Sequence, residues 1–136
     1  MTASEYLAAM AAPPAARRPA EDVEGPVHRA VLDALQLRLG SRYIVQHTPN
    51  RPRSKVQGGR EKRLGAVRGW PDLAIYGPGP TGPTAWFGEV KPPGVVVPEY
   101  QRELHARLRG AGFAVAVLRG VDDVEAALAE WGLPVR

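Results

Sequence analysis

The sequence contains no cysteine among its 136 residues. Disulfide bonds and thiolate metal sites are therefore excluded, and any bound metal ion must be held by oxygen atoms or imidazole nitrogens. The sequence also lacks an apolar run of the length that a membrane span requires. We therefore expect a soluble, cytoplasmic protein with no membrane partner, whose single domain buries one hydrophobic core.

Residues 1–20 are rich in alanine and proline, and Arg17 and Arg18 come late in this stretch. A secretory signal has the opposite order, with its basic residues first and an apolar stretch after them. We therefore interpret residues 1–20 as a flexible tail and residues 21–136 as the folded domain.

Basic residues outnumber acidic ones by 18 to 14, which gives a formal net charge of +4 and a pI of about 9.8. This modest excess favours a polyanionic partner without proving one. Its distribution is more informative, because Glu61 is the only acid between residues 51 and 68. Such a run is most often a solvated loop, but its glycines allow close backbone approach to phosphates, so we predict a nucleic-acid-binding loop. The predicted nucleic-acid-binding residues are Asn50, Arg51, Arg53, Lys55, Arg60, Lys62, Arg63 and Arg68.

Two short motifs carry two carboxylates and a lysine. They are Trp70-Pro71-Asp72-Leu73 and Gly88-Glu89-Val90-Lys91. Residues 84–91 are rich in aromatic and β-favouring residues and are bounded by glycine and proline clusters, which predicts a strand. Side chains alternate between the two faces of a strand, so Glu89 and Lys91 should point the same way.

Asp72 opens a second predicted strand, residues 73–76, which a Gly/Pro loop joins to the strand of Glu89. Sequential strands are most often neighbours, so Asp72 should lie beside Glu89. Two such carboxylates repel each other unless a cation lies between them, and Mg²⁺ and Mn²⁺ prefer carboxylate oxygens. A metal ion there would activate water against a phosphodiester, and Lys91 would orient that water or stabilise the phosphate.

Each motif also has a purely structural interpretation. A Pro-Asp pair is often only a turn, and an exposed Glu-x-Lys on a strand is often only a solvated ion pair. Their combination beside a basic loop is rarer than either motif alone. We therefore favour a metal-dependent nuclease.

The remaining periodicities predict an α/β sandwich around a mixed four-stranded sheet flanked by helices, in the order α-β-β-β-α-β-α, with no internal repeat. An apolar stripe of Val27, Val31, Leu35 and Leu39 defines the first helix. The predicted helices span residues 24–39, 98–109 and 121–131, and the predicted strands span residues 42–47, 73–76, 84–91 and 113–118.

Several polar residues fall on the apolar stripes of these helices. Glu24 lies on the inward stripe of the first helix, where its role is either functional or that of a first-turn acid that complements the helix dipole. His28 follows one turn later and is more typical of a packing or hydrogen-bonding residue than of a ligand. Gln101 lies on the buried side of the second helix, facing the strand of Glu89, and needs a polar partner that the metal site could provide. Asp122 and Asp123 have a structural explanation at the positive end of the last helix.

The chain carries, in this order on the predicted elements, Glu24, Asp72, Glu89-Val90-Lys91 and Gln101. With this set it resembles the PD-(D/E)xK nuclease superfamily and, within it, a small stand-alone VRR-NUC domain. The likeness covers roughly residues 24–128 and excludes the tail. The segments that carry it are residues 47–50, 53–55, 69–73, 88–91, 93–94 and 101–108, followed by Gly112 and the apolar strand after it.

The resemblance implies a restriction-endonuclease-like core and a role for each matching position. Asp72 and Glu89 would bind Mg²⁺ or Mn²⁺ together with the backbone carbonyl of Val90. Lys91 would be the catalytic lysine. Glu24 would be the first-helix acid, with direct, water-mediated and dipole roles all open, and Gln101 would be the polar residue of the second helix.

The resemblance also implies a hydrolase that acts as a structure-specific endodeoxyribonuclease. Small stand-alone members of bacterial or phage type form homodimers that cut branched DNA such as Holliday junctions, and larger members act in DNA repair. A non-catalytic nucleic-acid-binding module and a restriction-type nuclease remain as alternatives. Against the latter, no additional element for reading base edges is evident. Trp70 and Trp86 are expected to be core or strand residues and not base stackers.

Overall fold

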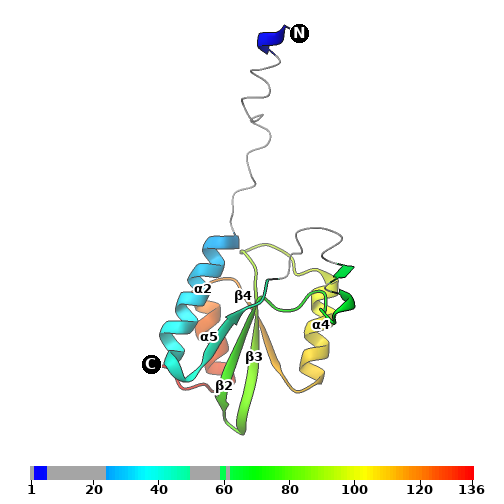
Figure 1. Ribbon diagram of the computed structural model, residues 1–136. Coiled ribbons are helices and arrows are strands. Elements are labelled where there is room, and N and C mark those ends of the chain that lie inside the picture. Colours follow the sequence, from blue (N-terminus) through cyan, green and yellow to red (C-terminus); the bar gives the residue numbers. More distant parts are fainter. Residues whose placement is uncertain (1, 6–23, 50–58, 61) are drawn as a thin grey trace.

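The computed structural model describes residues 2–5, 24–49, 59–60 and 62–136 (Figure 1). Residues 6–20 of the predicted tail, the predicted domain boundary at residue 21 and residues 50–58 of the basic loop lie outside the described residues. The helices and strands follow the predicted order. They are α2 (Glu24–Leu39), the 3-10 turn η2 (Gly40–Arg42), β1 (Ile44–His47), β2 (Leu73–Gly79), β3 (Gly82–Val90), α4 (Glu99–Gly110), β4 (Ala114–Leu118) and α5 (Val121–Trp131).

The four strands form one sheet in the order β1-β2-β3-β4. The β1–β2 and β2–β3 pairs are antiparallel, whereas β3 and β4 are parallel and α4 makes the crossover between them. The predicted mixed four-stranded sheet flanked by helices is confirmed. A parallel pair needs a crossover of this length, which is why a helix of three turns stands between β3 and β4.

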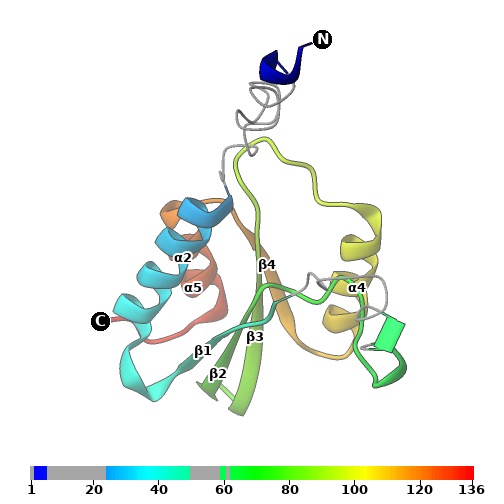
Figure 2. The same ribbon diagram turned by 45° about the horizontal axis from the view of Figure 1, so that its top comes forward.

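Helices cover both faces of the sheet, with α2 and α5 on one face and α4 on the other (Figure 2). The alternation of side chains along β3 explains the two layers. Trp86 and Val90 pack in the core with α2 and α5, whereas Ala85 and Phe87 pack in the core with α4. Glu89 therefore points to the α4 face.

The apolar stripes that predict the helices are the buried faces in the structure. Val31, Leu35 and Leu39 of α2 are buried, and Val27 is partly buried against the same core. In α4 the buried apolar residues are Leu104 and Leu108, and in α5 they are Val124, Ala127 and Leu128. These side chains contribute the apolar burial that holds the helices to the sheet.

Several strand boundaries differ from the prediction. The first strand begins at Ile44 and not at Arg42, because residues 40–42 form the turn η2, where Gly40 has a φ of +71°. The second strand continues through Gly77-Pro78-Gly79 instead of stopping at Tyr76. The third strand runs from Gly82 to Val90, so Lys91 is the first residue after it.

Packing explains why the Gly-Pro-Gly sequence remains extended. A Cβ atom at Gly77 would collide with a ring carbon of Tyr43, so glycine leaves the room that this buried ring occupies. The Tyr43 hydroxyl donates a hydrogen bond to the Pro78 carbonyl oxygen at 2.8 Å. Tertiary contacts therefore override the turn preference of this segment.

The two tryptophans that the sequence assigns to the core or the strands lie in the core layers. Trp86 is buried, and the Trp70 ring packs edge-on against Phe87 with 5.5 Å between ring centroids. In the described part of the chain, no helix has the length and apolar character needed to cross a membrane.

Candidate active site

Asp72 and Glu89 meet at the end of the β2–β3 hairpin. Leu73 pairs with Gly88 in the antiparallel register, so Asp72 and Glu89 are the next facing positions. The side chain of Asp72 accepts a hydrogen bond from the Val90 N–H at 2.8 Å, and its carbonyl oxygen accepts one from the Thr48 N–H at 2.8 Å. The backbone around Asp72 is thus tied to the ends of both neighbouring strands.

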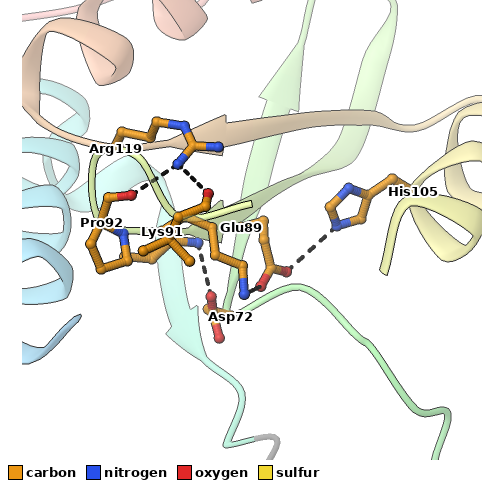
Figure 3. Close-up of polar contacts among 8 residues, drawn as sticks. Asp72, Glu89, Lys91, Pro92, His105 and Arg119 are labelled. Carbon is orange, nitrogen blue, oxygen red and sulfur yellow. Dashed lines mark hydrogen bonds and ion pairs between the residues drawn. The ribbon is translucent and has the colours of Figure 1, made fainter. Parts of the chain in front are cut away.

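Glu89 is 1% exposed and lies between two groups that can donate hydrogen bonds (Figure 3). Lys91 Nζ lies 3.8 Å from Glu89 Oε1, and His105 Nε2 of α4 lies 3.5 Å from Glu89 Oε2. As the strand alternation predicts, Glu89 and Lys91 point the same way. Both separations are longer than an ordinary N–H···O hydrogen bond.

Burial and the nearby Glu89 carboxylate change the acidity of Asp72. Burial raises the pKa of Asp72 to about 6, and the charge of Glu89 adds to this rise. The Val90 N–H and the ammonium group of Lys91 act in the opposite direction. Asp72 therefore ionises only at a cost in free energy, and a cation beside the two carboxylates would reduce this cost.

A cavity of about 590 Å³ opens over these groups. All five predicted catalytic side chains line it: Glu24, Asp72, Glu89, Lys91 and Gln101. They come from four places in the fold, because α2, the start of β2, the end of β3 and the start of α4 meet there. Gln101 is 8% exposed, and its Oε1 atom has no hydrogen-bond partner among the described residues.

Histidines also lie in or next to the cavity, and the sequence assigned a site role to none of them. His28 and His47 line it and pack edge-on with 4.6 Å between ring centroids. Burial lowers the pKa of His28, and His47 adds to this, whereas Asp72 and Glu24 oppose it. His105 is 2% exposed, and its position one turn after Gln101 on the same helix was the signal that could have identified it.

The segment after Lys91 is held by Arg119, which follows β4. Arg119 Nη1 donates to the carbonyl oxygens of Pro92 at 2.9 Å and of Val95 at 2.7 Å (Figure 3). The backbone N–H of Arg119 donates in turn to the carboxylate of Asp123 in α5. Asp123 therefore has a structural contact, in agreement with the interpretation of Asp122 and Asp123 as residues of the helix start.

The described part of the predicted basic loop is exposed and ends at the cavity. It comprises Arg60, Lys62, Arg63 and Arg68, whereas Asn50, Arg51, Arg53 and Lys55 lie outside the described residues. The guanidinium carbon of Arg68 lies 4.3 Å from the ring centroid of Tyr100, which itself lines the cavity. The next residue, Gly69, has a φ of +83°, and a Cβ atom there would lie 3.0 Å from the Tyr100 ring.

The oxygen atoms at this site suit a hard divalent cation. Gln101 Oε1 is buried without a hydrogen-bond partner in the described structure, and Asp72 and Glu89 repel each other. Among the described residues, no three His, Asp or Glu side chains stand close enough together to hold a metal ion. An ion at Asp72 and Glu89 would therefore need the Val90 carbonyl, water and substrate oxygens as well, and Mg²⁺ commonly keeps such ligands.

The sheet order, the helices on both faces and the carboxylates at the end of the hairpin define a restriction-endonuclease-like α/β fold. Comparison with solved structures agrees. One structure described as a VRR_NUC domain has a TM-score of 0.55 and 26% sequence identity, and the match covers 79% of this chain and 95% of that chain. A second, described as a VRR_NUC domain protein, has a TM-score of 0.62 and 21% identity, with 82% and 90% covered.

The resemblance to VRR-NUC domains is therefore confirmed in three dimensions: this chain has the VRR-NUC fold. No family model matches the sequence, and no curated protein matches it significantly.

Proposed function

We propose that this protein is a Mg²⁺- or Mn²⁺-dependent endodeoxyribonuclease that hydrolyses phosphodiester bonds in branched DNA, such as Holliday junctions. One observation carries the proposal: Asp72, Glu89 and Lys91 converge in a single cavity, and the basic residue Arg68 lies over the ring of Tyr100, which lines that cavity. The VRR-NUC fold supports the same chemistry.

Asp72 and Glu89, with the carbonyl oxygen of Val90, are the groups that would hold the metal ion. The bound ion would lower the pKa of water and balance charge on the phosphate. Lys91 extends into the same cavity from beside Glu89, where its ammonium group can bind a phosphate oxygen or orient the attacking water. Gln101 supplies a buried amide whose oxygen can accept a hydrogen bond from that water.

The exposed basic residues would hold the DNA backbone. Arg60, Lys62 and Arg63 are exposed in the segment before Asp72, and Arg68 is exposed over the ring of Tyr100, which lines the cavity. Contacts of this type track phosphates irrespective of base sequence. Selection for branched DNA would then come from the spacing of two sites, and we propose a homodimer for this reason.

The sheet edge offers support for a homodimer. β1 is an edge strand, and its Ile44 is 68% exposed beside Tyr76 of β2, which is 40% exposed. An exposed edge strand with apolar side chains is a template for pairing with another chain.

Cleavage of end-labelled DNA tests the proposal. Four-way junction, flap and linear duplex DNA are incubated with Mg²⁺, Mn²⁺ or EDTA and with wild type, Asp72→Ala and Lys91→Ala. We expect metal-dependent cutting of the branched DNAs that both substitutions abolish. Binding without cutting under every metal condition would contradict the proposal and favour a non-catalytic nucleic-acid-binding module, whereas cutting confined to one duplex sequence would favour a restriction-type nuclease.

A further inference from the structure

A buried histidine lies against the Glu89 carboxylate and has no part in the roles proposed above. His105 belongs to α4 and follows Gln101 by one helical turn. Its Nε2 atom is 3.5 Å from Glu89 Oε2, on the opposite side of the carboxylate from Lys91 (Figure 3). The two oxygens of one buried carboxylate therefore face two different donor groups.

The facing atoms of this pair lack other partners. Neither Glu89 Oε2 nor His105 Nε2 has a hydrogen-bond partner within the described parts of the chain. Buried polar atoms cost free energy unless they are hydrogen-bonded, so an orphaned donor and an orphaned acceptor that face each other call for a common explanation. A neutral imidazole with its proton on Nε2 can donate, and an ionised carboxylate can only accept.

The separation suits a contact that shortens when a ligand binds. At 3.5 Å the two atoms are about half an ångström beyond an ordinary N–H···O bond. Hydrogen bonds in active sites are often long before the ligand arrives and tighten in the complex. A small rotation of the Glu89 side chain would complete this bond.

The rest of the α4 face shows that a polar side chain is not needed there for packing. Leu104 and Leu108 fill the core on this side of the sheet, and Gln101 and His105 are the only buried polar residues of the helix. An apolar side chain at position 105 would bury as well as its neighbours do, without the cost of an unpaired nitrogen.

We propose that His105 is a positioning residue that donates from Nε2 to Glu89 Oε2 and thereby presents Oε1 to the metal ion. The inference rests on the proposed metal-dependent function. Partners of this kind fix the orientation of a ligand and raise metal affinity, and their loss commonly weakens metal binding about 10- to 100-fold.

Calorimetric titration of the full-length protein with Mn²⁺, without DNA, tests the inference directly. We expect His105→Leu, which cannot donate, to bind Mn²⁺ about 10- to 100-fold more weakly than wild type. His105→Gln places an amide N–H donor at a similar reach and is expected to recover most of the lost affinity. If His105→Leu does not fold, His105→Asn replaces it, because its shorter amide does not reach Glu89.

Leu108→Ala is the matched control. Leu108 is buried on the same helix, but it packs in the apolar core with Phe87 and not against the carboxylate. We expect this variant to melt at a lower temperature and to keep the Mn²⁺ affinity of wild type, since only packing is lost.

Three results would overturn the inference. The first is unchanged Mn²⁺ affinity in the non-donating variant at position 105. The second is an equal loss of affinity in Leu108→Ala, which would assign the effect to packing. The third is the absence of Mn²⁺ binding in wild type, which would contradict the proposed function as well and is recognised before any substitution is made.

Discussion

Asp72→Asn should make the metal-free protein more stable while abolishing metal-dependent cleavage. The asparagine oxygen can still accept the hydrogen bond that the Val90 N–H donates to Asp72. Its amide group can also donate to Glu89, a contact that the aspartate makes only when it is protonated. The substitution therefore removes a buried charge and the repulsion from Glu89, with little change in shape.

The magnitude follows from the pKa of Asp72, which burial and the charge of Glu89 raise from 3.8 to about 6. In a fully buried group, a shift of this size corresponds to about 3 kcal/mol at neutral pH. Asp72 is only partly buried, so solvent screening reduces the effect to about 1–2 kcal/mol. A change of this size should raise the melting temperature by about 3–8 °C in EDTA at pH 7.5.

The stability difference between Asp72→Asn and wild type should depend on pH. The folded state holds the Asp72 proton more tightly than the unfolded state does, so the penalty is absent below about pH 4, grows as the pH rises, and is complete above about pH 6. The difference in melting temperature between Asp72→Asn and wild type should therefore be large at pH 7.5 and small at pH 4. Comparing the two proteins at each pH cancels the titration of the other acids.

The control is Asp122→Asn, at an exposed acid in the first turn of α5. It should lower stability by up to about 1 kcal/mol, because a favourable charge at the helix N-terminus is lost. Destabilisation by Asp72→Asn at pH 7.5, or a stabilisation equal at both pH values, would refute the reasoning. Addition of Mn²⁺ should raise the melting temperature of wild type and leave that of Asp72→Asn nearly unchanged.

Three further predictions concern the groups around this site. Lys91→Ala should slow single-turnover cleavage at least about 100-fold while DNA binding in EDTA stays close to that of wild type. An equal loss of DNA binding would instead indicate a purely electrostatic role for Lys91. Gly88→Ala should lower the free energy of unfolding in urea by about 1–3 kcal/mol, because its Cβ atom would lie 2.8 Å from a neighbouring side chain, whereas Gly110→Ala, with open space around it, should not. Tyr100→Ala should weaken DNA binding by releasing Arg68, and Tyr100→Phe, which keeps the ring, should not.

The pairing of Asp72 with Glu89 could be predicted because it depends on local rules. Strand alternation sets the side of Glu89 and Lys91, and a short hairpin connection sets the neighbour of Asp72. The strand ends were predicted less well. Gly77-Pro78-Gly79 has the composition of a turn and remains extended because Tyr43, distant in sequence, packs against it.

The cavity walls and the altered acidity could not be predicted in the same way. The sequence places Glu24 on the inner side of a helix, but only the packing of α2 on the sheet brings it over the end of the β2–β3 hairpin. Periodicity also places His105 on the buried side of α4, but the residue that it faces is set by the crossover from β3 to β4. The pKa of Asp72 depends on burial that no spacing reveals.

The free-energy cost of holding Asp72 and Glu89 together argues against a protein that only binds nucleic acid. Exposed basic residues suffice to hold phosphates, and they need no buried acid behind them. Here Glu89 is 1% exposed with one oxygen unpartnered among the described residues, and Asp72 is held beside it at a cost in free energy. Apolar residues of similar volume would relieve this cost, as they often do when they replace buried charges. A cation between the two carboxylates would relieve it as well and would make the same arrangement catalytic, which is the reason we propose the chemistry at this end of the sheet.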